Sequence, residues 1–244
     1  MSPFGYTVLG FGGGKNQTYT AVSQDIPTGT ETEFAAHYAA APNSDWISAD
    51  KFIAIWSADD DSPAYVGRSI VGSVSGTSIS FGSMAHYSSN RAYQMAVASD
   101  PFNDDKFVVI FEDNSDAGHG HAVVGTVSGT TPSYGTEVEF DDSGACRDIN
   151  IDFDPNTENK FVINTKGGLN STSTGCATVG TISGTSISFA TPIELTSTNN
   201  NEQCVKFNPS AANAGKFVVT YGEAESGYHG KARLGQIASQ TPDP

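Results

Sequence analysis

The feature that most constrains this fold is an internal repeat with a period of about 55 residues. Lys-Phe dipeptides begin at residues 51, 106, 160 and 216, so successive copies lie 55, 54 and 56 residues apart. A second marker, Val-Gly-x-Val/Ile-Ser-Gly, occurs at 71–76, 124–129 and 179–184, and a degenerate copy occupies 234–239. Two markers with the same period indicate duplicated supersecondary units rather than chance similarity.

Each unit contains short segments with strand character. In the third unit, residues 106–111 (KFVVIF) form a continuous apolar run, which suits a central strand covered on both faces. Residues 149–153 (INIDF) alternate apolar and polar side chains, as in a half-buried strand. Further strands are expected at 121–127 and 137–140, with fourth strands of other units at 77–81 and 185–189. Helical periodicity is nearly absent, so we predict an all-β fold.

Four-stranded units of this length are typical of propeller blades. The chain is expected to form one domain, 1–244, a five-bladed β-propeller with units at about 1–50, 51–105, 106–159, 160–215 and 216–244. Because the chain starts and stops within a unit, the closing blade is expected to combine both termini, which would hide the open sheet edges. The alternatives are that a neighbouring copy of the chain completes the closing blade, or that one blade has fewer than four strands.

The first unit has lost both markers. Its strands are expected at 6–10, 18–23 and 32–34, and the first strand of the second unit is expected near 45–48. This departure from the repeat makes the first unit a candidate for a specialised seam or docking surface.

The chain is acidic, with 27 Asp and Glu against 12 Lys and Arg and a formal net charge of −15. Nucleic-acid backbones and anionic membranes repel such a charge, so neither is expected as a partner. No apolar run approaches the roughly 18 residues of a membrane span, and the start lacks the regions of a secretory signal. We expect synthesis in a cytoplasm, where Cys146, Cys176 and Cys204 would remain free thiols.

One face of the expected propeller carries the irregular loops. Loops between the second and third strands cover residues 57–66, 112–120, 165–175 and 222–230, and connections to the next unit include 84–91 and 141–147. In an up-and-down blade both kinds of loop emerge on the same face, opposite the short Ser-Gly-Thr-Ser turns. Variable loops on a rigid repeat scaffold commonly bind ligands, so we expect any ligand on this variable-loop face.

Aromatic rings and carboxylates in these loops favour sugar recognition, because rings stack on sugar C–H faces and carboxylates accept hydrogen bonds from hydroxyls. The alternative interpretation is solvated residues that cap turns. The candidate ligand-binding residues are Asp59, Asp61, Tyr65, Asp113, Asp116, His119, Glu223, Tyr228 and His229. Trp56, Phe111 and Tyr221 end equivalent strands and are expected to pack in the core or at its rim.

No catalytic or cofactor motif is found, so no catalytic residue, cofactor or metal ligand is assigned. Calcium is an alternative at 100–105 and 154–158, but proline at the second position and the missing glycine favour type I turns. His119 and His121 are the closest histidine pair, for which a plain loop is expected rather than a metal site. A glycosidase needs paired carboxylates, for which Asp148 or Asp152 could serve, yet the repeats share no such pattern.

The unit KFVVxYxDxxxxGxxxxVGTVSGTSISFG stands at 51–82, 106–135 and 160–190. It resembles repeats of structural and tail-fibre-like β-propeller proteins of marine bacteriophages, and the resemblance covers most of the chain. It implies a non-enzymatic, lectin-like virion protein, made in the host cytoplasm, that binds a cell-surface glycan or receptor. Contacts with other virion proteins or with further copies of the chain are also implied. The alternatives are a purely structural decoration or tail protein and a five-bladed glycoside hydrolase.

Overall fold

The computed structural model describes residues 31–36, 38–59, 65–142, 146–167, 174–196, 200–223, 227 and 229–237. Within these ranges the protein is all-β, as the sequence predicts, and the only helical segment is one 3₁₀ turn, η1 (Ala211–Asn213). The strands are β1 (Ala39–Trp46), β2 (Lys51–Ala58), β3 (Val66–Ser75), β4 (Ser78–Phe81), β5 (Ala85–Ser99), β6 (Lys106–Asp113), β7 (His119–Ser128), β8 (Thr131–Tyr134), β9 (Val138–Asp141), β10 (Arg147–Phe153), β11 (Lys160–Lys166), β12 (Gly175–Ser183), β13 (Ser186–Phe189), β14 (Ile193–Thr196), β15 (Asn200–Phe207), β16 (Lys216–Glu223) and β17 (His229–Gln236).

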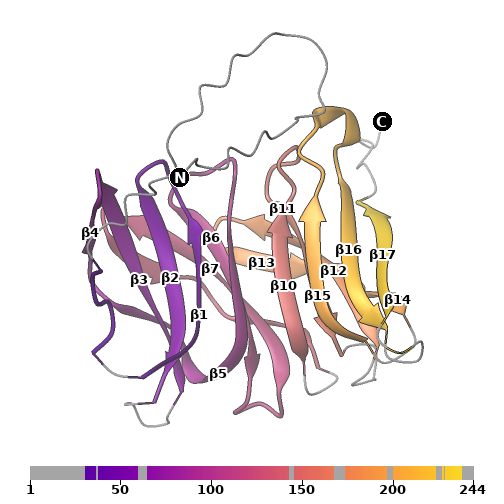
Figure 1. The fold of residues 1–244 in the computed structure, drawn as a ribbon, viewed down its shortest axis with the longest axis horizontal. Coiled ribbons are helices and arrows are strands. Elements are labelled where there is room, and N and C mark those ends of the chain that lie inside the picture. The colour runs from indigo at the N-terminus through magenta and orange to yellow at the C-terminus, as the bar shows by residue number, and fades with distance from the viewer. Residues whose placement is uncertain are drawn as a thin grey trace, which may run out of the picture.

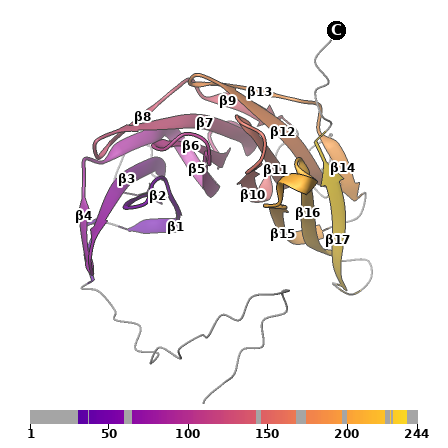
Figure 2. The ribbon, with the colours of Figure 1, turned by 90° about the horizontal axis from the view of Figure 1, so that it is seen from above.

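Strand pairing follows the repeat. The strands that open with Lys-Phe (β2, β6, β11 and β16) each lie between an inner strand (β1, β5, β10 or β15) and an outer one (β3, β7, β12 or β17), all antiparallel. The units stand side by side (Figure 1). Seen from above, they follow a strongly curled arc, with the four inner strands on its concave side (Figure 2).

The second and third units share one strand, which the sequence did not predict. Residues 85–91 of β5 pair with β3, and residues 92–99 pair with β6. This 15-residue strand therefore ends one unit and begins the next, and the two units form a single nine-stranded sheet. The loop predicted at 84–91 is wrong over 85–91, because Tyr87, only 3% exposed, anchors this segment in the core between the units.

The outer edges of the second, third and fourth units are each divided between two short strand segments. The predicted strands at 77–81 and 185–189 exist as β4 and β13, but each pairs with only part of its neighbour. The rest of that edge is taken by residues 85–91 of β5 or by β14, and in the third unit β8 and β9 divide it in the same way. Of the strands predicted in the first unit, 32–34 is not a strand, whereas 6–10 and 18–23 lie outside the described residues.

The two sequence markers are partners across one ladder. The repeated phenylalanines lie directly opposite the repeated glycines, in the pairs Phe52–Gly72, Phe107–Gly125, Phe161–Gly180 and Phe217–Gly235. A Cβ atom placed on any of these glycines would lie 2.1–2.3 Å from Cζ of the facing ring. The ring therefore covers the bare glycine backbone, which explains why both markers keep the same period.

Hydrophobic cores lie between successive units. Phe107 and Val109 of β6 face the core shared with the second unit, whereas Val108 and Ile110 face the core shared with the fourth. β6 is buried on both faces for this reason, which confirms the interpretation of the apolar run at 106–111. The aromatic residues that end equivalent strands are also buried, which confirms the core packing predicted for Trp56, Phe111 and Tyr221.

Carboxylates join neighbouring inner strands. Asp45 of β1 accepts a hydrogen bond from the Ser99 N–H of β5 at 2.8 Å, and Asp152 of β10 accepts one from the Phe207 N–H of β15 at 2.7 Å. Asp152 also pairs with Nζ of Lys206 at 2.8 Å. Because charge-assisted hydrogen bonds are short and directional, these contacts fix the spacing between units. Asp152, a catalytic candidate from sequence, thus joins two units.

Candidate ligand-binding site

Every inner strand carries a bulge close to the point where its pairing with the adjacent Lys-Phe strand begins. The pairing register shifts at residues 40–43 in β1, 93–96 in β5, 147–150 in β10 and 201–204 in β15. Ala41, Gln94 and Asp148 adopt left-handed backbone conformations there, with φ of 47°, 42° and 48°. Bulges and strained non-glycine residues are enriched at functional sites. Their repetition at one level of the inner strands makes this level the first candidate for a binding site.

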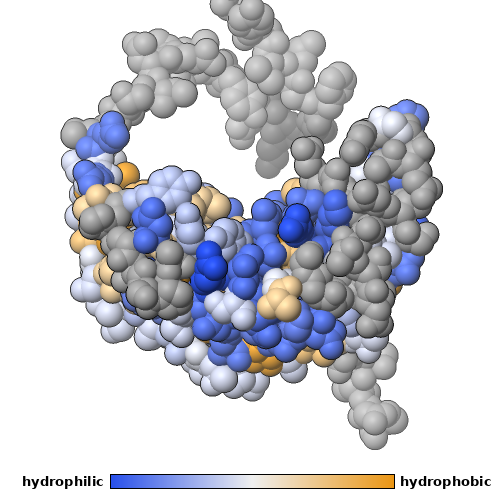
Figure 3. Space-filling view, turned by 90° about the horizontal axis from the view of Figure 1, so that it is seen from below, coloured by the Kyte–Doolittle hydropathy of each residue, from blue (hydrophilic) through white to orange (hydrophobic). Residues whose placement is uncertain are grey.

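A cavity of about 460 Å³ opens at the level of the bulges. Four inner strands and β2 contribute to its wall, which consists of Ala40, Ala41, Pro42, Asn43, Ser57, Tyr93, Gln94, Met95, Asp148, Ile149 and Gln203. This axial cavity lies where the inner strands begin, at the end of the molecule that carries the variable loops. Viewed from that end, hydrophilic residues gather along the inner side of the arc (Figure 3).

Tyr93 gives the axial cavity an aromatic wall. The rings of Tyr93 and Tyr65 lie 5.3 Å apart between centroids, with 38° between their planes. The Arg91 guanidinium lies over the Tyr65 ring at 5.8 Å, and its Nη2 donates to the Tyr93 hydroxyl at 3.4 Å. Tyr65, a candidate from sequence, therefore supports the wall from behind. Tyr93 is not among the residues predicted from the sequence, because it lies in a strand and the candidates were chosen from the irregular loops.

Gln203 contributes an unpaired donor to the same wall. Its side chain is almost fully buried, and its Oε1 accepts a hydrogen bond from Nδ2 of Asn164 at 3.2 Å. Its Nε2 is buried and has no hydrogen-bond partner. Leaving a buried donor unpaired costs about 1–3 kcal/mol, and Oδ1 of the neighbouring Asn164 is also buried without a partner.

Three other predicted residues gather in the third unit rather than at the axial cavity. They belong to a histidine–carboxylate cluster made of Asp113, Asp116, His119, His121, Glu137 and Glu139. His119 lies in β7, not in the loop predicted at 112–120, because β6 and β7 extend the hairpin ladder to the Asp113–His119 pair.

The imidazole of His121 is nearly buried within this cluster. Burial lowers the pKa of His121, but the hydrogen bond and charge of Glu137, the charge of Asp113 and the hydrogen bond with Asp116 outweigh burial. The pKa of His121 is therefore raised above its ordinary value. Glu137 and Glu139 were missed from the sequence, although alternation places both on the face of the sheet that His119 and His121 share.

The remaining predicted residues are dispersed. Glu223 is buried, forms an ion pair with Lys231 and lines a separate hollow of about 490 Å³ beside β17. His229 lies exposed opposite Glu223 at the start of β17, and Asp59 is exposed after the end of β2. Asp61 and Tyr228 lie outside the described residues. The seven candidates that the structure describes therefore do not converge on one site.

The aspartates considered for calcium cap their own turns. Oδ1 of Asp100 accepts a hydrogen bond from the Phe102 N–H at 2.9 Å, and Oδ1 of Asp154 accepts one from the Asn156 N–H at 2.9 Å. Hydrogen bonding to the backbone two residues ahead is the pattern expected of an Asp that initiates a turn. One oxygen of each carboxylate is thus engaged as the turn interpretation predicts, whereas Oδ2 of Asp154 is buried without a hydrogen-bond partner.

All three cysteines are free, as predicted. Burial raises the pKa of the Cys146 thiol well above its usual range, and burial raises the pKa of Cys176 to about 11. Because the thiolate is the reactive species, both are shielded from thiol reagents. Cys204 is exposed.

No protein-family model matches this chain, and no curated protein is detectably similar to it in sequence. Across the described residues, no helix has the length and apolar character needed to span a membrane. The functional argument therefore depends on the geometry of the axial cavity and of the histidine–carboxylate cluster.

Proposed function

We propose that this chain is a non-enzymatic carbohydrate-binding protein and that the axial cavity holds the sugar. The observation that carries the proposal is the convergence of four repeated bulges on one cavity walled by an aromatic ring, amides and a carboxylate. Ligand sites in rigid scaffolds commonly combine apolar surface with a few fixed polar groups.

The wall chemistry suits a sugar. The ring of Tyr93 offers a face for sugar C–H groups, and its stacking against Tyr65 holds that face in place. The amide of Gln94 offers both a donor and an acceptor, whereas the Asp148 carboxylate accepts. Since each sugar hydroxyl both donates and accepts, such a mixed lining can satisfy several hydroxyls at once.

Binding is favoured over hydrolysis because the described wall contains one carboxylate, Asp148. Glycoside hydrolysis generally uses two, about 5–9.5 Å apart, as acid and as base or nucleophile. Asp152, the other sequence candidate, is committed to the Phe207 N–H and to Lys206.

The proposal extends to a closed five-bladed ring on a virion. Val219 and Tyr221 of β16 are buried and lie on one face of the last described unit. On the opposite face, Val218 of β16 is 39% exposed and Leu234 of β17 is 67% exposed, so that face is uncovered. A closing blade would cover that face. Leu234→Asp should then lower the melting temperature by several degrees, whereas an unchanged melting temperature would count against ring closure. The virion assignment rests on the resemblance of the repeat alone.

A glycan array, followed by titration calorimetry with the best ligand, tests the sugar site. Tyr93→Ala and Gln94→Gly should each weaken binding at least tenfold, and Gln94→Gly also relieves the left-handed φ of 42°, so its fold should persist. His229→Ala, on an exposed strand away from the cavity, is the matched control and should bind normally.

Two results would overturn this proposal. One is an array without any ligand, or binding lost in His229→Ala but kept in Tyr93→Ala. The other is polysaccharide cleavage that Asp148→Asn abolishes, which would make the protein a hydrolase.

A further inference from the structure

The histidine–carboxylate cluster has a geometry that the carbohydrate proposal does not use. His119 and His121 are two residues apart on β7, so both rings lie on the same face of the sheet. Glu139 of β9 stands directly opposite His121 in the ladder, and Glu137 lies two residues before Glu139. The hairpin loop between β6 and β7 adds Asp116. Two neighbouring strands and one loop thus direct nitrogen and oxygen donors towards each other.

Asp116, His121 and Glu139 each offer one donor atom within 4.8 Å of the other two, and Nδ1 of His119 lies beside both carboxylates. Nε2 of His121 lies 3.3 Å from Oδ2 of Asp116, and that same oxygen lies 3.6 Å from Nδ1 of His119. Nδ1 of His119 also lies 3.0 Å from Oε1 of Glu139. Zn²⁺ binds N and O donors at about 2.0–2.2 Å, so neighbouring ligands of a tetrahedral ion lie about 3.4 Å apart. The observed separations match that spacing.

The nitrogen of His119 shows that this arrangement is not a finished hydrogen-bond network. Nδ1 is buried and has no hydrogen-bond partner, although Oε1 of Glu139 is only 3.0 Å away. The two atoms are close without the alignment that a hydrogen bond requires. Ligands to a common ion are placed in this way, because each is directed at the ion rather than at the other.

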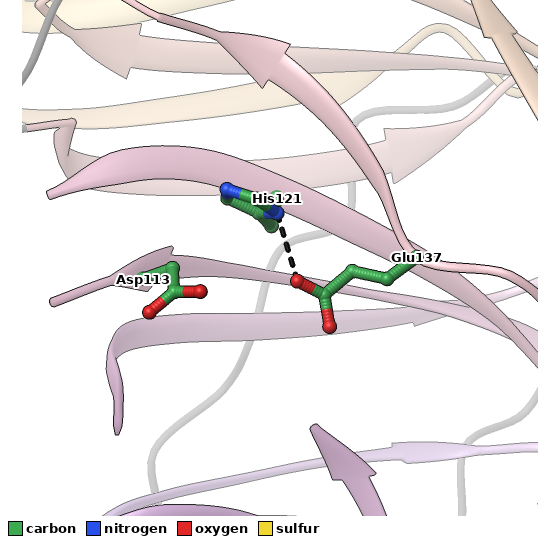
Figure 4. Close-up of side chains that lie close together, drawn as sticks. All are labelled: Asp113, His121 and Glu137. Carbon is green, nitrogen blue, oxygen red and sulfur yellow. Dashed lines mark ion pairs between the residues drawn. The ribbon is translucent and has the colours of Figure 1, made fainter. Parts of the chain in front are cut away.

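The other nitrogen of His121 has the partner that metal-binding histidines generally have. Nδ1 lies 2.8 Å from Oε1 of Glu137, and Oε2 of Glu137 accepts a hydrogen bond from Oγ of Ser88 at 3.1 Å. Figure 4 shows the carboxylates of Glu137 and Asp113 beside the ring, with the ion pair to Glu137 dashed. A carboxylate on the second nitrogen fixes the tautomer and orientation of a ligating imidazole.

Asp113 is occupied by the hairpin itself. Its Oδ2 accepts a hydrogen bond from Nδ2 of Asn90 at 2.7 Å, and its Oδ1 accepts one from the Ser115 N–H at 2.8 Å. These contacts shape the loop that presents Asp116. Asp113 therefore holds the hairpin and ties it to β5. On the other side of the ring, Nε2 of His121 has the Asp116 carboxylate as its hydrogen-bond partner at 3.3 Å, a contact that a bound ion would replace.

We propose that this cluster binds a divalent transition-metal ion of the zinc class through Asp116, His121 and Glu139, with His119 beside the two carboxylates as a further donor and Glu137 as a positioning residue. Imidazole and carboxylate donors together favour such an ion over calcium, which prefers six to eight oxygen ligands. No metal site was predicted here, because the pairing of β7 with β9, which brings Glu137 and Glu139 to the two histidines, is not visible in the sequence. The bound ion would tie the β6–β7 hairpin to β9.

Calorimetric titration of the chelator-treated full chain with Zn²⁺ tests the proposal. Wild type should bind Zn²⁺, and its melting temperature should rise with the free Zn²⁺ concentration. His121→Gln and Glu139→Gln should weaken binding at least tenfold, and Glu137→Gln should weaken it about 10–100-fold without removing a ligand. His229→Gln removes an exposed histidine outside the cluster and should leave affinity unchanged.

Co²⁺ provides a second measurement, because its visible absorption reports the coordinating atoms. The absorption should change in His121→Gln and stay unchanged in His229→Gln. If His121→Gln does not fold, Glu139→Gln decides the outcome, since Glu139 is solvent-exposed and its replacement is isosteric. Absence of Zn²⁺ binding, equal affinity in the wild type and the cluster variants, or Ca²⁺ binding without Zn²⁺ binding would overturn the proposal.

Discussion

The pairing of phenylalanine with glycine predicts a specific sensitivity to Gly125→Ala. The added Cβ would lie 2.2 Å from Cζ of Phe107, whereas ordinary contacts begin at 3.4 Å, so the ring must move by more than 1 Å. Phe107 is fully buried and cannot swing into solvent. Overpacking of this kind costs about 1–3 kcal/mol, offset in part by the lower chain entropy of alanine. We expect a loss of about 2 kcal/mol, which corresponds to about 4–8 °C in melting temperature for a chain of this size.

Thermal and denaturant unfolding measured by circular dichroism would test this expectation. Gly230→Ala is the matched control, because that strand glycine has nothing within 4 Å of the added Cβ and should change stability by less than about 0.5 kcal/mol. In a Phe107→Leu background, Gly125→Ala should cost less, since the ring is gone. Equal stability of Gly125→Ala and Gly230→Ala would refute the idea that the ring–glycine contact sustains the repeat.

Three further predictions concern buried groups. A thiol reagent should modify Cys204 rapidly in the native protein and Cys146 and Cys176 only after unfolding, and fast modification of all three would contradict the burial described. Asp152→Ala should lower the free energy of unfolding by about 1–3 kcal/mol, because the Phe207 N–H loses its charged acceptor; no change in the denaturation midpoint would contradict this. Burial raises the pKa of Glu112, and the charge of Arg147 only partly offsets that rise. Because the folded pKa lies above the unfolded pKa, the stability that this carboxyl contributes is fully present below the unfolded pKa. That contribution is lost as the pH rises through the folded pKa. Glu112→Gln should therefore be more stable than wild type at pH 7 and lose that advantage below about pH 4.5, as melting temperatures across pH would show; a pH-independent difference would count against it.

Periodicity made the strands predictable but not the connections between units. The run at 106–111 is apolar throughout because each side chain enters one of two cores, and that pattern is visible without a structure. Residues 85–91 carry no comparable alternation, so the sequence suggested a loop. Their strand character comes from pairing with β3 and from the burial of Tyr87, both of which are long-range.

The candidate sites were only partly predictable for a related reason. Tyr65 and Asp116 were identified because they stand in irregular loops, where binding residues are expected. Tyr93 and Gln94 lie in a strand, and only the bulge at 93–96 presents them to a cavity. Glu137 and Glu139 become partners of His119 and His121 only through the register of β7 and β9, although two short alternating motifs, His-x-His and Glu-x-Glu, offered a usable signal.

A crystal structure of the protein with its best array ligand would test most directly where the sugar binds. We expect the sugar in the axial cavity, with a ring face on Tyr93 and a hydroxyl donating to the Asp148 carboxylate. A sugar bound at Glu223 and His229 beside β17, with the axial cavity empty, would contradict the proposed role of the repeated bulges.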